Sequence, residues 1–91
     1  MSFLRAADFP AAPALGVAGL VTGRTGIPKA LVGVNFRGPN NYAAITDSQG
    51  RFQLGDIKPG RYVITVSQGH NRQQFIRVLQ VGEQLHLEVR W

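Results

Sequence analysis

The sequence predicts an all-β domain with the architecture of a seven-stranded Greek-key β-sandwich. Short segments in which apolar and polar residues alternate recur along the chain, and no segment shows the 3.6-residue period of an amphipathic helix. Eleven glycines and five prolines supply the turns that many short strands need. Alternation and turn density together favour two packed sheets.

The length is that of one small domain. A chain of 91 residues buries about 60–65% of its extended surface on folding, which is enough for one core. Residues 1–15 are rich in alanine and proline and have no sustained period, so we interpret them as a flexible linker or tail. Residues 16–91 are the expected sandwich domain.

The first three expected strands are bounded by glycine and proline. Residues 16–22 have a β pattern in which Val17, Gly19 and Val21 alternate with Ala18, Leu20 and Thr22. This strand ends at the loop 23–29, whose Gly26 and Pro28 indicate turns. Residues 30–37 alternate strictly, as a half-buried strand does. A break at 38–41 precedes a third strand at 42–46, of which either face could be buried.

The stretch after the third strand contains two turns of different chemistry. In the first, Asp47 can accept backbone N–H bonds and Gly50 can take positive φ without steric cost. A hairpin loop with glycine near its end is a common connection between antiparallel strands. Phe52 and Leu54 then lie two residues apart on a short strand and should both point inward.

In the second turn, Pro59 presets φ and Gly60 supplies positive φ, as a type II turn requires. Tyr62 begins a strong fifth strand on its inward face, and the sixth and seventh expected strands are 73–81 and 84–91. The residues expected to form turns and core in this region and the first strand are Gly19, Asp47, Gly50, Phe52, Pro59, Gly60 and Tyr62.

The sixth strand supplies the most promising partner surface. Phe75, Arg77 and Leu79 form an apolar and basic stripe on the face that we predict to point outward, and His70 and Arg72 lie in the polar loop before it. The alternative is a register in which Phe75 packs in the core, since a one-residue shift exchanges the two faces of a strand. Trp91 can likewise close the end of the sandwich or contact a following domain.

The sequence contains no recognisable catalytic or metal-binding grouping. Without cysteine, disulfides and thiolate metal sites are excluded, and no serine lies in a nucleophile-elbow pattern. His70 and His86 are interpreted as surface histidines. Asp47 and Asp56 lie in separate turns and fall short of the oxygen ligands that calcium takes. We therefore predict no catalytic residue, no metal, no cofactor and no enzymatic activity.

The motifs resemble the carboxypeptidase regulatory-like domain, a transthyretin-like sandwich grouped with Cna B-type domains. The matching runs are Gly19–Val21, Gly26–Pro28, Ala30–Val34, Thr46–Phe52 and Ile57–Tyr62. The resemblance implies a non-catalytic accessory module of a secreted, periplasmic or cell-envelope protein. Such modules brace or present neighbouring domains, or bind protein or glycan partners.

Charge and hydropathy limit the partners further. Ten basic residues oppose five acidic ones, but the arginines are scattered, which is not typical of a nucleic-acid footprint. The longest apolar run contains prolines and glycines, and we expect no signal peptide or transmembrane segment in this chain. The expected partners are a neighbouring domain or another protein, with glycan as a possibility, through an outer sheet face, an edge strand or the 69–72 loop.

Overall fold

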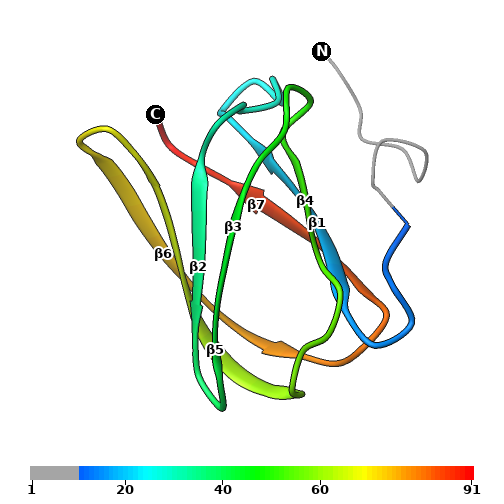
Figure 1. Cartoon of the computed structure of the whole chain (residues 1–91). Helices are drawn as coiled ribbons and strands as arrows, with labels where there is room; N and C mark the ends of the chain where they lie inside the picture. The colour runs from blue at the N-terminus through cyan, green and yellow to red at the C-terminus, as the bar shows by residue number, and fades with distance from the viewer. Residues whose placement is uncertain (1–10) are drawn as a thin grey trace.

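The computed structural model describes residues 11–91, which form a β-sandwich of seven strands (Figure 1). No helix occurs among these residues, so none of them forms a helical membrane span. The strands are β1 Val17–Thr22, β2 Gly33–Arg37, β3 Asn41–Ile45, β4 Arg51–Leu54, β5 Gly60–Gln68, β6 Asn71–Leu79 and β7 Glu83–Glu88. The predicted all-β class and the predicted number of strands are confirmed.

The strands divide into two sheets that pack face to face. One sheet has three strands in the order β4-β1-β7, and the other has four in the order β3-β2-β5-β6. All pairings are antiparallel except that of β1 with β7, which joins the first and last strands in parallel. The chain passes from one sheet to the other in the loop before β2, in the β3–β4 turn, in the β4–β5 turn and after β6. The hairpin predicted at Asp47–Gly50 is therefore wrong, because β3 pairs with β2 and β4 pairs with β1.

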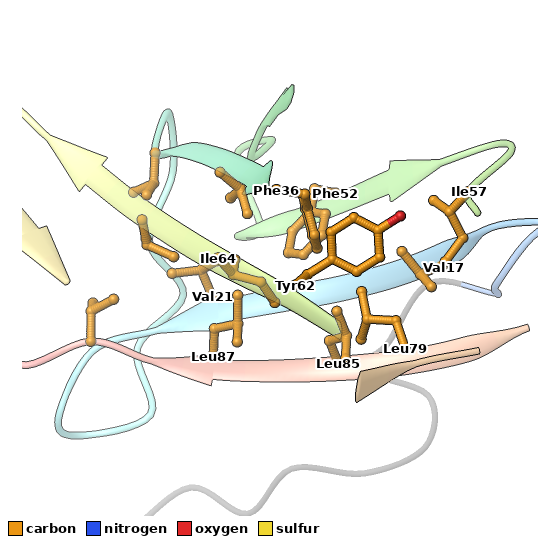
Figure 2. Packing of buried hydrophobic residues seen from close by; sticks show 14 residues of the cluster. Val17, Val21, Phe36, Phe52, Ile57, Tyr62, Ile64, Leu79, Leu85 and Leu87 are labelled. Carbon is orange, nitrogen blue, oxygen red and sulfur yellow. The ribbon is translucent and has the colours of Figure 1, made fainter. Parts of the chain in front are cut away.

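The core lies between the sheets and is built from one side-chain parity of each strand (Figure 2). Aromatic rings occupy its centre: the Phe36 ring lies 6.0 Å from that of Phe52 and 6.1 Å from that of Tyr62. These tilted and edge-on arrangements are the favoured geometries for buried rings. Aliphatic side chains of β1, β5, β6 and β7 complete the packing.

Strand boundaries differ from the expectation at three places. β2 begins only at Gly33, because Leu31 takes a φ of 57° and interrupts the extended chain. The predicted polar loop before the sixth strand is a two-residue turn at Gly69 and His70, because glycine at φ 59° allows a tight hairpin. The last strand ends at Glu88.

Part of the predicted tail lies outside the described residues, which begin at residue 11. The described part is attached to the sandwich: the Ile57 N–H donates to Leu15 O at 2.9 Å, and Leu15 forms a β-bridge with Asp56. The Gln53 amide also donates to Ala11 O at 2.9 Å. The boundary at residue 16 as a limit of independent folding stays a prediction.

Candidate functional site

The outer face of the four-stranded sheet is the largest regular surface whose side chains the core does not use. The register places outward side chains of neighbouring strands in rows. One row joins Asn35 of β2, Thr65 of β5 and Gln74 of β6, and the next contains Val63 and Ile76. Because side chains in one row lie about 4.5–5.5 Å apart, each row acts as one surface.

One half of this face, the apolar half, is aliphatic. It consists of Val63, Ile76 and Val78, which are 36%, 54% and 67% exposed. Val63 pairs directly with Ile76 on one side and with Arg37 on the other, and Arg61 pairs with Val78, so the three aliphatic side chains are neighbours beside two arginines. Contiguous exposed aliphatic groups on a rigid sheet are typical of contact surfaces.

The other half contains an open depression of about 420 Å³, here called the basic depression. It lies where β2 and β5 approach the β5–β6 hairpin. Its lining residues are Asn35, Arg37, Thr65, Ser67, Gly69, His70, Asn71 and Arg72. A shallower hollow of about 320 Å³ shares Asn35, Arg37 and Thr65 with it and continues towards β3. The lining has hydrogen-bonding side chains and two guanidinium groups, but no aliphatic side chain.

Charge is divided unequally between the two sheets. The four-stranded sheet carries Arg37, Arg61, Arg72 and Arg77 and no acidic residue within its strands. The described acidic residues lie elsewhere: two in turns of the β3–β5 region and two on β7. Within residues 11–91, Arg51 Nε and Asp47 Oδ2 form an ion pair at a distance of 3.7 Å. The charged side chains on the sheet's outer face, Arg37, Arg61 and Arg72, are therefore all basic.

The outward stripe predicted on the sixth strand is corrected by the structure. Leu79 is 1% exposed and Phe75 packs against the core, so this parity of β6 points inward. Apolar residues occur on both faces of β6, so only the pairing with β5 shows which face points inward. Arg77 is nevertheless exposed because β6 is an edge strand. Its guanidinium lies 5.4 Å from the Phe75 ring centre and donates to Ile76 O at 2.9 Å.

The predicted loop residues His70 and Arg72 are both exposed, and both line the basic depression. The structure thus brings them together with Arg37, which is more than thirty positions earlier in the chain. Sequence reasoning did not select Arg37, Asn35 or the Ile76–Val78 pair. Alternation places Ile76 and Val78 on one face of the sixth strand, but only the pairing with β5 shows that this face points outward.

The conspicuous residues of the 46–62 stretch have structural partners. Asp47 Oδ1 accepts from the N–H groups of Gln49 at 2.8 Å and Arg51 at 2.9 Å, and Gly50 has a φ of 75°. These N–H groups, that of Arg51 foremost, together with the Arg51 charge, lower the pKa of the Asp47 carboxyl. Phe52 is 4% exposed, and its ring faces Gly19.

The second turn is held by two tyrosines. Tyr62 is 1% exposed and its hydroxyl donates to Lys58 O, while the Tyr42 hydroxyl accepts from Lys58 N at 2.8 Å. Burial raises the pKa of Tyr62, whereas the hydrogen bond from the Asn40 amide leads the causes that lower the pKa of Tyr42. Gly60 follows Pro59 with a positive φ of 150°, but a type II turn requires about +80° at this position, and Gly60 already begins β5. The predicted type II turn is therefore wrong.

The two histidines lie in different sheets. His70 occupies the β5–β6 turn, whereas His86 is half-buried on β7 with Nε2 2.6 Å from Thr22 Oγ1. Within the described residues no group of three or more histidine, cysteine or acidic side chains is placed to hold a metal ion. The outer face therefore offers donors for binding a ligand by hydrogen bonds and charge.

Two glutamines, Gln68 and Gln73, form hydrogen bonds that link segments at one side of the sandwich, and the sequence did not predict either role. The Gln73 amide donates to Glu88 O at 3.4 Å and accepts from Arg90 N at 3.0 Å, which links β6 to the chain after β7. Gln68 donates to Ala30 O at 2.9 Å and accepts from Trp91 Nε1 at 3.3 Å. Trp91 is half-buried and packs against the core, closing that end of the sandwich. Nothing local distinguishes these two glutamines from exposed ones.

The fold and this surface define a class of small β-sandwich module that presents sheet faces rather than an enclosed cleft. Residues 16–91 match the family model of the carboxypeptidase regulatory-like domain, and the chain belongs to that family. The resemblance inferred from the turn motifs is thereby confirmed. No curated protein matches the chain significantly.

Two solved structures are similar in fold. The Bacillus anthracis TIE protein superposes with a TM-score of 0.65 at 16% identity, over 82% of this chain and 16% of that one. A Pseudomonas aeruginosa protein described as a candidate carbohydrate binding protein superposes with a TM-score of 0.54 at 13% identity, over 93% of each chain. The chain thus spans 16% of the length of the Bacillus protein, and at these identities both likenesses show the fold alone.

Proposed function

We propose that this domain is a structural module that braces and presents neighbouring domains of a larger secreted or cell-envelope protein. The observation that carries the proposal is the attachment of the chain on both sides of the sandwich. Leu15 is bonded to Ile57 before β1, and Trp91 is bonded to Gln68 after β7. A module held in this way transmits orientation, because the chain leaves it along defined directions.

Two further observations support this function. A sandwich of this fold forms 16% of the much longer Bacillus anthracis protein, as expected for a module used within larger chains. The apolar half, Val63, Ile76 and Val78, supplies a surface that a neighbouring domain of the same polypeptide would cover. Arg77 and Arg61 border that contact and would meet acidic groups there. Membership of a regulatory-like family agrees with a non-catalytic role.

Orientation can be measured directly. The chain has no cysteine, so Asn41→Cys on β3 accepts a single dye, and a fluorescent reporter domain can be fused after Trp91. Rigid presentation predicts a narrow distance distribution between dye and reporter by time-resolved energy transfer. Gln68→Ala releases the Trp91 indole and should broaden the distribution. Gln74→Ala, on the outer face, should leave it unchanged.

A different outcome would remove the proposal. If the wild-type distribution is already as broad as that of Gln68→Ala, the domain is a flexible connector. Thermal melting of each variant shows whether a broad distribution comes from loss of the Trp91 anchor or from loss of folding. Loss of the anchor alone should leave the melting temperature of Gln68→Ala close to that of the wild type.

A second candidate function, glycan binding, is favoured by the basic depression. Its lining of amide, hydroxyl and guanidinium groups resembles the polar chemistry of a saccharide, and the Pseudomonas aeruginosa neighbour is described in terms of carbohydrate binding. The large exposed hydrophobic residues of the described chain are all aliphatic, so no aromatic ring offers a stacking platform there. Binding to an array of oligosaccharides tests this candidate, and depression variants should weaken it.

A further inference from the structure

The basic depression has the composition of a site for a hydrophilic anion. Its polar lining includes the side chains of Asn35, Thr65, Ser67 and Asn71, which donate and accept hydrogen bonds. The lining contains no Ala, Val, Leu or Ile side chain, and its one ring is the imidazole of His70. A ligand therefore gains little from hydrophobic burial here and must be recognised by hydrogen bonds and charge.

Two guanidinium groups dominate the charge of the depression. Arg37 comes from β2 and Arg72 from β6, and both are exposed. No acidic residue belongs to any strand of this sheet, and the ion pair of the described chain lies on the other sheet. Two uncompensated guanidinium groups flanking one hollow attract anionic groups, and their planar forks match the geometry of carboxylates.

The shape favours a polymer over a small enclosed molecule. The depression is open, and the adjoining hollow towards β3 shares Asn35, Arg37 and Thr65 with it. The rest of that hollow is lined by Phe36, Asn41, Tyr42 and Ala43, so it is less polar than the depression. Together they form a track across the strands, from the β5–β6 hairpin to β3. An extended polymer bound along this track would contact both arginines and the asparagine side chains that line it, whereas a compact ligand would fill only part of the track.

Other anionic polymers fit this track less well. Single-stranded nucleic acid gains much of its affinity from bases stacked on aromatic rings, and the aromatic side chains of the four-stranded sheet face the core or its rim. An acidic peptide segment would find apolar lining only in the hollow towards β3, at Phe36, Tyr42 and Ala43, and would leave its apolar side chains without contacts in the depression itself. A polysaccharide presents hydroxyl groups to the amides and has no apolar side chain to bury.

We propose that the basic depression binds an acidic polysaccharide of the uronate class, with Arg37 and Arg72 each contacting a sugar carboxylate. The proposal rests on the glycan-binding candidate above and names its substrate class. Asn35, Thr65, Ser67 and Asn71 bond the sugar hydroxyls. The apolar half of the same face stays available for a neighbouring domain, so the two surfaces serve different partners.

The test uses isothermal titration of the chain with two matched probes. Tetragalacturonate supplies four carboxylates, and its methyl ester has the same backbone with the charges removed. We expect binding of tetragalacturonate that is at least about tenfold tighter than that of the ester. Raising sodium chloride from about 50 mM to about 500 mM should weaken it, because exposed charges are then screened.

Matched arginine variants locate the binding. Arg37→Gln and Arg72→Gln should each weaken tetragalacturonate binding about tenfold, as expected for one charge-assisted contact. Arg24→Gln removes the same charge from the exposed loop after β1, which does not line the depression, and should change affinity by less than about twofold. Circular dichroism melting confirms that each variant folds.

Each contrary outcome has a distinct meaning. Equal loss in Arg24→Gln would show general attraction to a basic protein and overturn the site. Equal affinity for the methyl ester would leave glycan binding standing and overturn the acidic specificity. Binding of neither probe would overturn the uronate site, while the glycan candidate stands or falls on the oligosaccharide array and the structural role on its own orientation measurement. Tighter, arginine-dependent binding of a single-stranded oligonucleotide would replace the polysaccharide by nucleic acid.

Discussion

The two sheets of this sandwich use the same strand chemistry differently. In the three-stranded sheet, every residue of the central strand β1 is buried, and the flanking β7 carries two glutamates. In the four-stranded sheet, β2 and β5 bury one parity and expose the other, and all the charges in the strands are arginines. The side chains of the first sheet therefore mostly stabilise the fold, whereas the outer face of the second sheet is exposed and available for contacts with a partner.

This difference explains why the alternation of polarity is informative in one sheet and not in the other. A strand with one solvated face shows alternating residues, as β2 does, whereas a strand buried on both faces shows a continuous apolar run, as β1 does. Substitutions that probe the two faces of one strand, or equivalent positions in the two sheets, test the comparison directly.

The largest expected effect separates the inner and outer faces of β6. Leu79→Ala removes a side chain that is 1% exposed and should lower the free energy of unfolding by about 2–5 kcal/mol. Val78→Ala, one residue earlier and 67% exposed, should change it by no more than about 0.5 kcal/mol. Urea denaturation monitored by Trp91 fluorescence measures both. A reversed order would restore the outward stripe that the sequence first suggested.

A smaller effect distinguishes glycines at matched positions in the two sheets. A Cβ at Gly19 of β1 would lie 2.1 Å from Cζ of Phe52, whereas one at Gly33 of β2 would meet its nearest atom, Ser67 Oγ, at 3.5 Å. Gly19→Ala should destabilise by about 1–3 kcal/mol through overpacking. Gly33→Ala should be neutral or stabilise by up to about 1 kcal/mol, because it restricts the unfolded chain.

The contact with Phe52 can be tested separately. In a Phe52→Leu background the ring is absent, so the additional cost of Gly19→Ala should decrease in a double-mutant cycle. An unchanged cost would mean that the strain at Gly19 comes from the backbone and not from the ring.

The turn chemistry was accessible from sequence because it is local. Asp47 and Gly50 form their own turn within a few residues, because Asp47 accepts hydrogen bonds from Gln49 and Arg51. The alternation around Phe52 and Tyr62 assigns their faces without knowledge of any partner strand. The family motifs consist of such residues, which is why fold and family followed from the sequence.

The candidate site was not accessible in this way because it is assembled by pairing. Arg37 and Arg72 meet because β2 and β6 both flank β5 in a register that sequence alternation does not specify. On β6, apolar residues occupy both parities, and an arginine in the inward set suggested the wrong face. An edge strand tolerates that arginine, because its guanidinium reaches solvent past Phe75.

The junction between the sheets depends on a buried threonine. The Thr46 hydroxyl accepts from Val32 N at 2.9 Å and donates to Lys29 O at 2.6 Å, which joins the loop before β2 to the end of β3. Thr46→Val keeps the shape but leaves these groups unpaired, and should cost about 1–3 kcal/mol. Thr46→Ser retains the hydroxyl and should cost less. Equal losses in the two variants would assign the effect to the methyl group instead.

The smallest effect concerns the buried threonine of the other sheet, Thr22, and its partner His86. Burial lowers the pKa of His86 below its ordinary value of 6.5, while the Glu88 charge acts in the opposite direction. The folded chain therefore holds the imidazole neutral where the unfolded chain binds a proton. Stability from this site is complete above about pH 6.5 and decreases as the pH falls through the lowered pKa.

His86→Gln removes the titrating group, so its urea midpoint should vary less between pH 7 and pH 5 than that of the wild type. Asp47, whose pKa lies below its ordinary value of 3.8, does not titrate in this window. His70→Gln is the matched control on the exposed hairpin of the four-stranded sheet, and its midpoint should follow the wild-type curve. If His70→Gln instead reduced the pH dependence of the urea midpoint, the proton-linked stability would belong to the four-stranded sheet. The contrast between a sheet used for stability and a sheet used for contacts would then be wrong for this property.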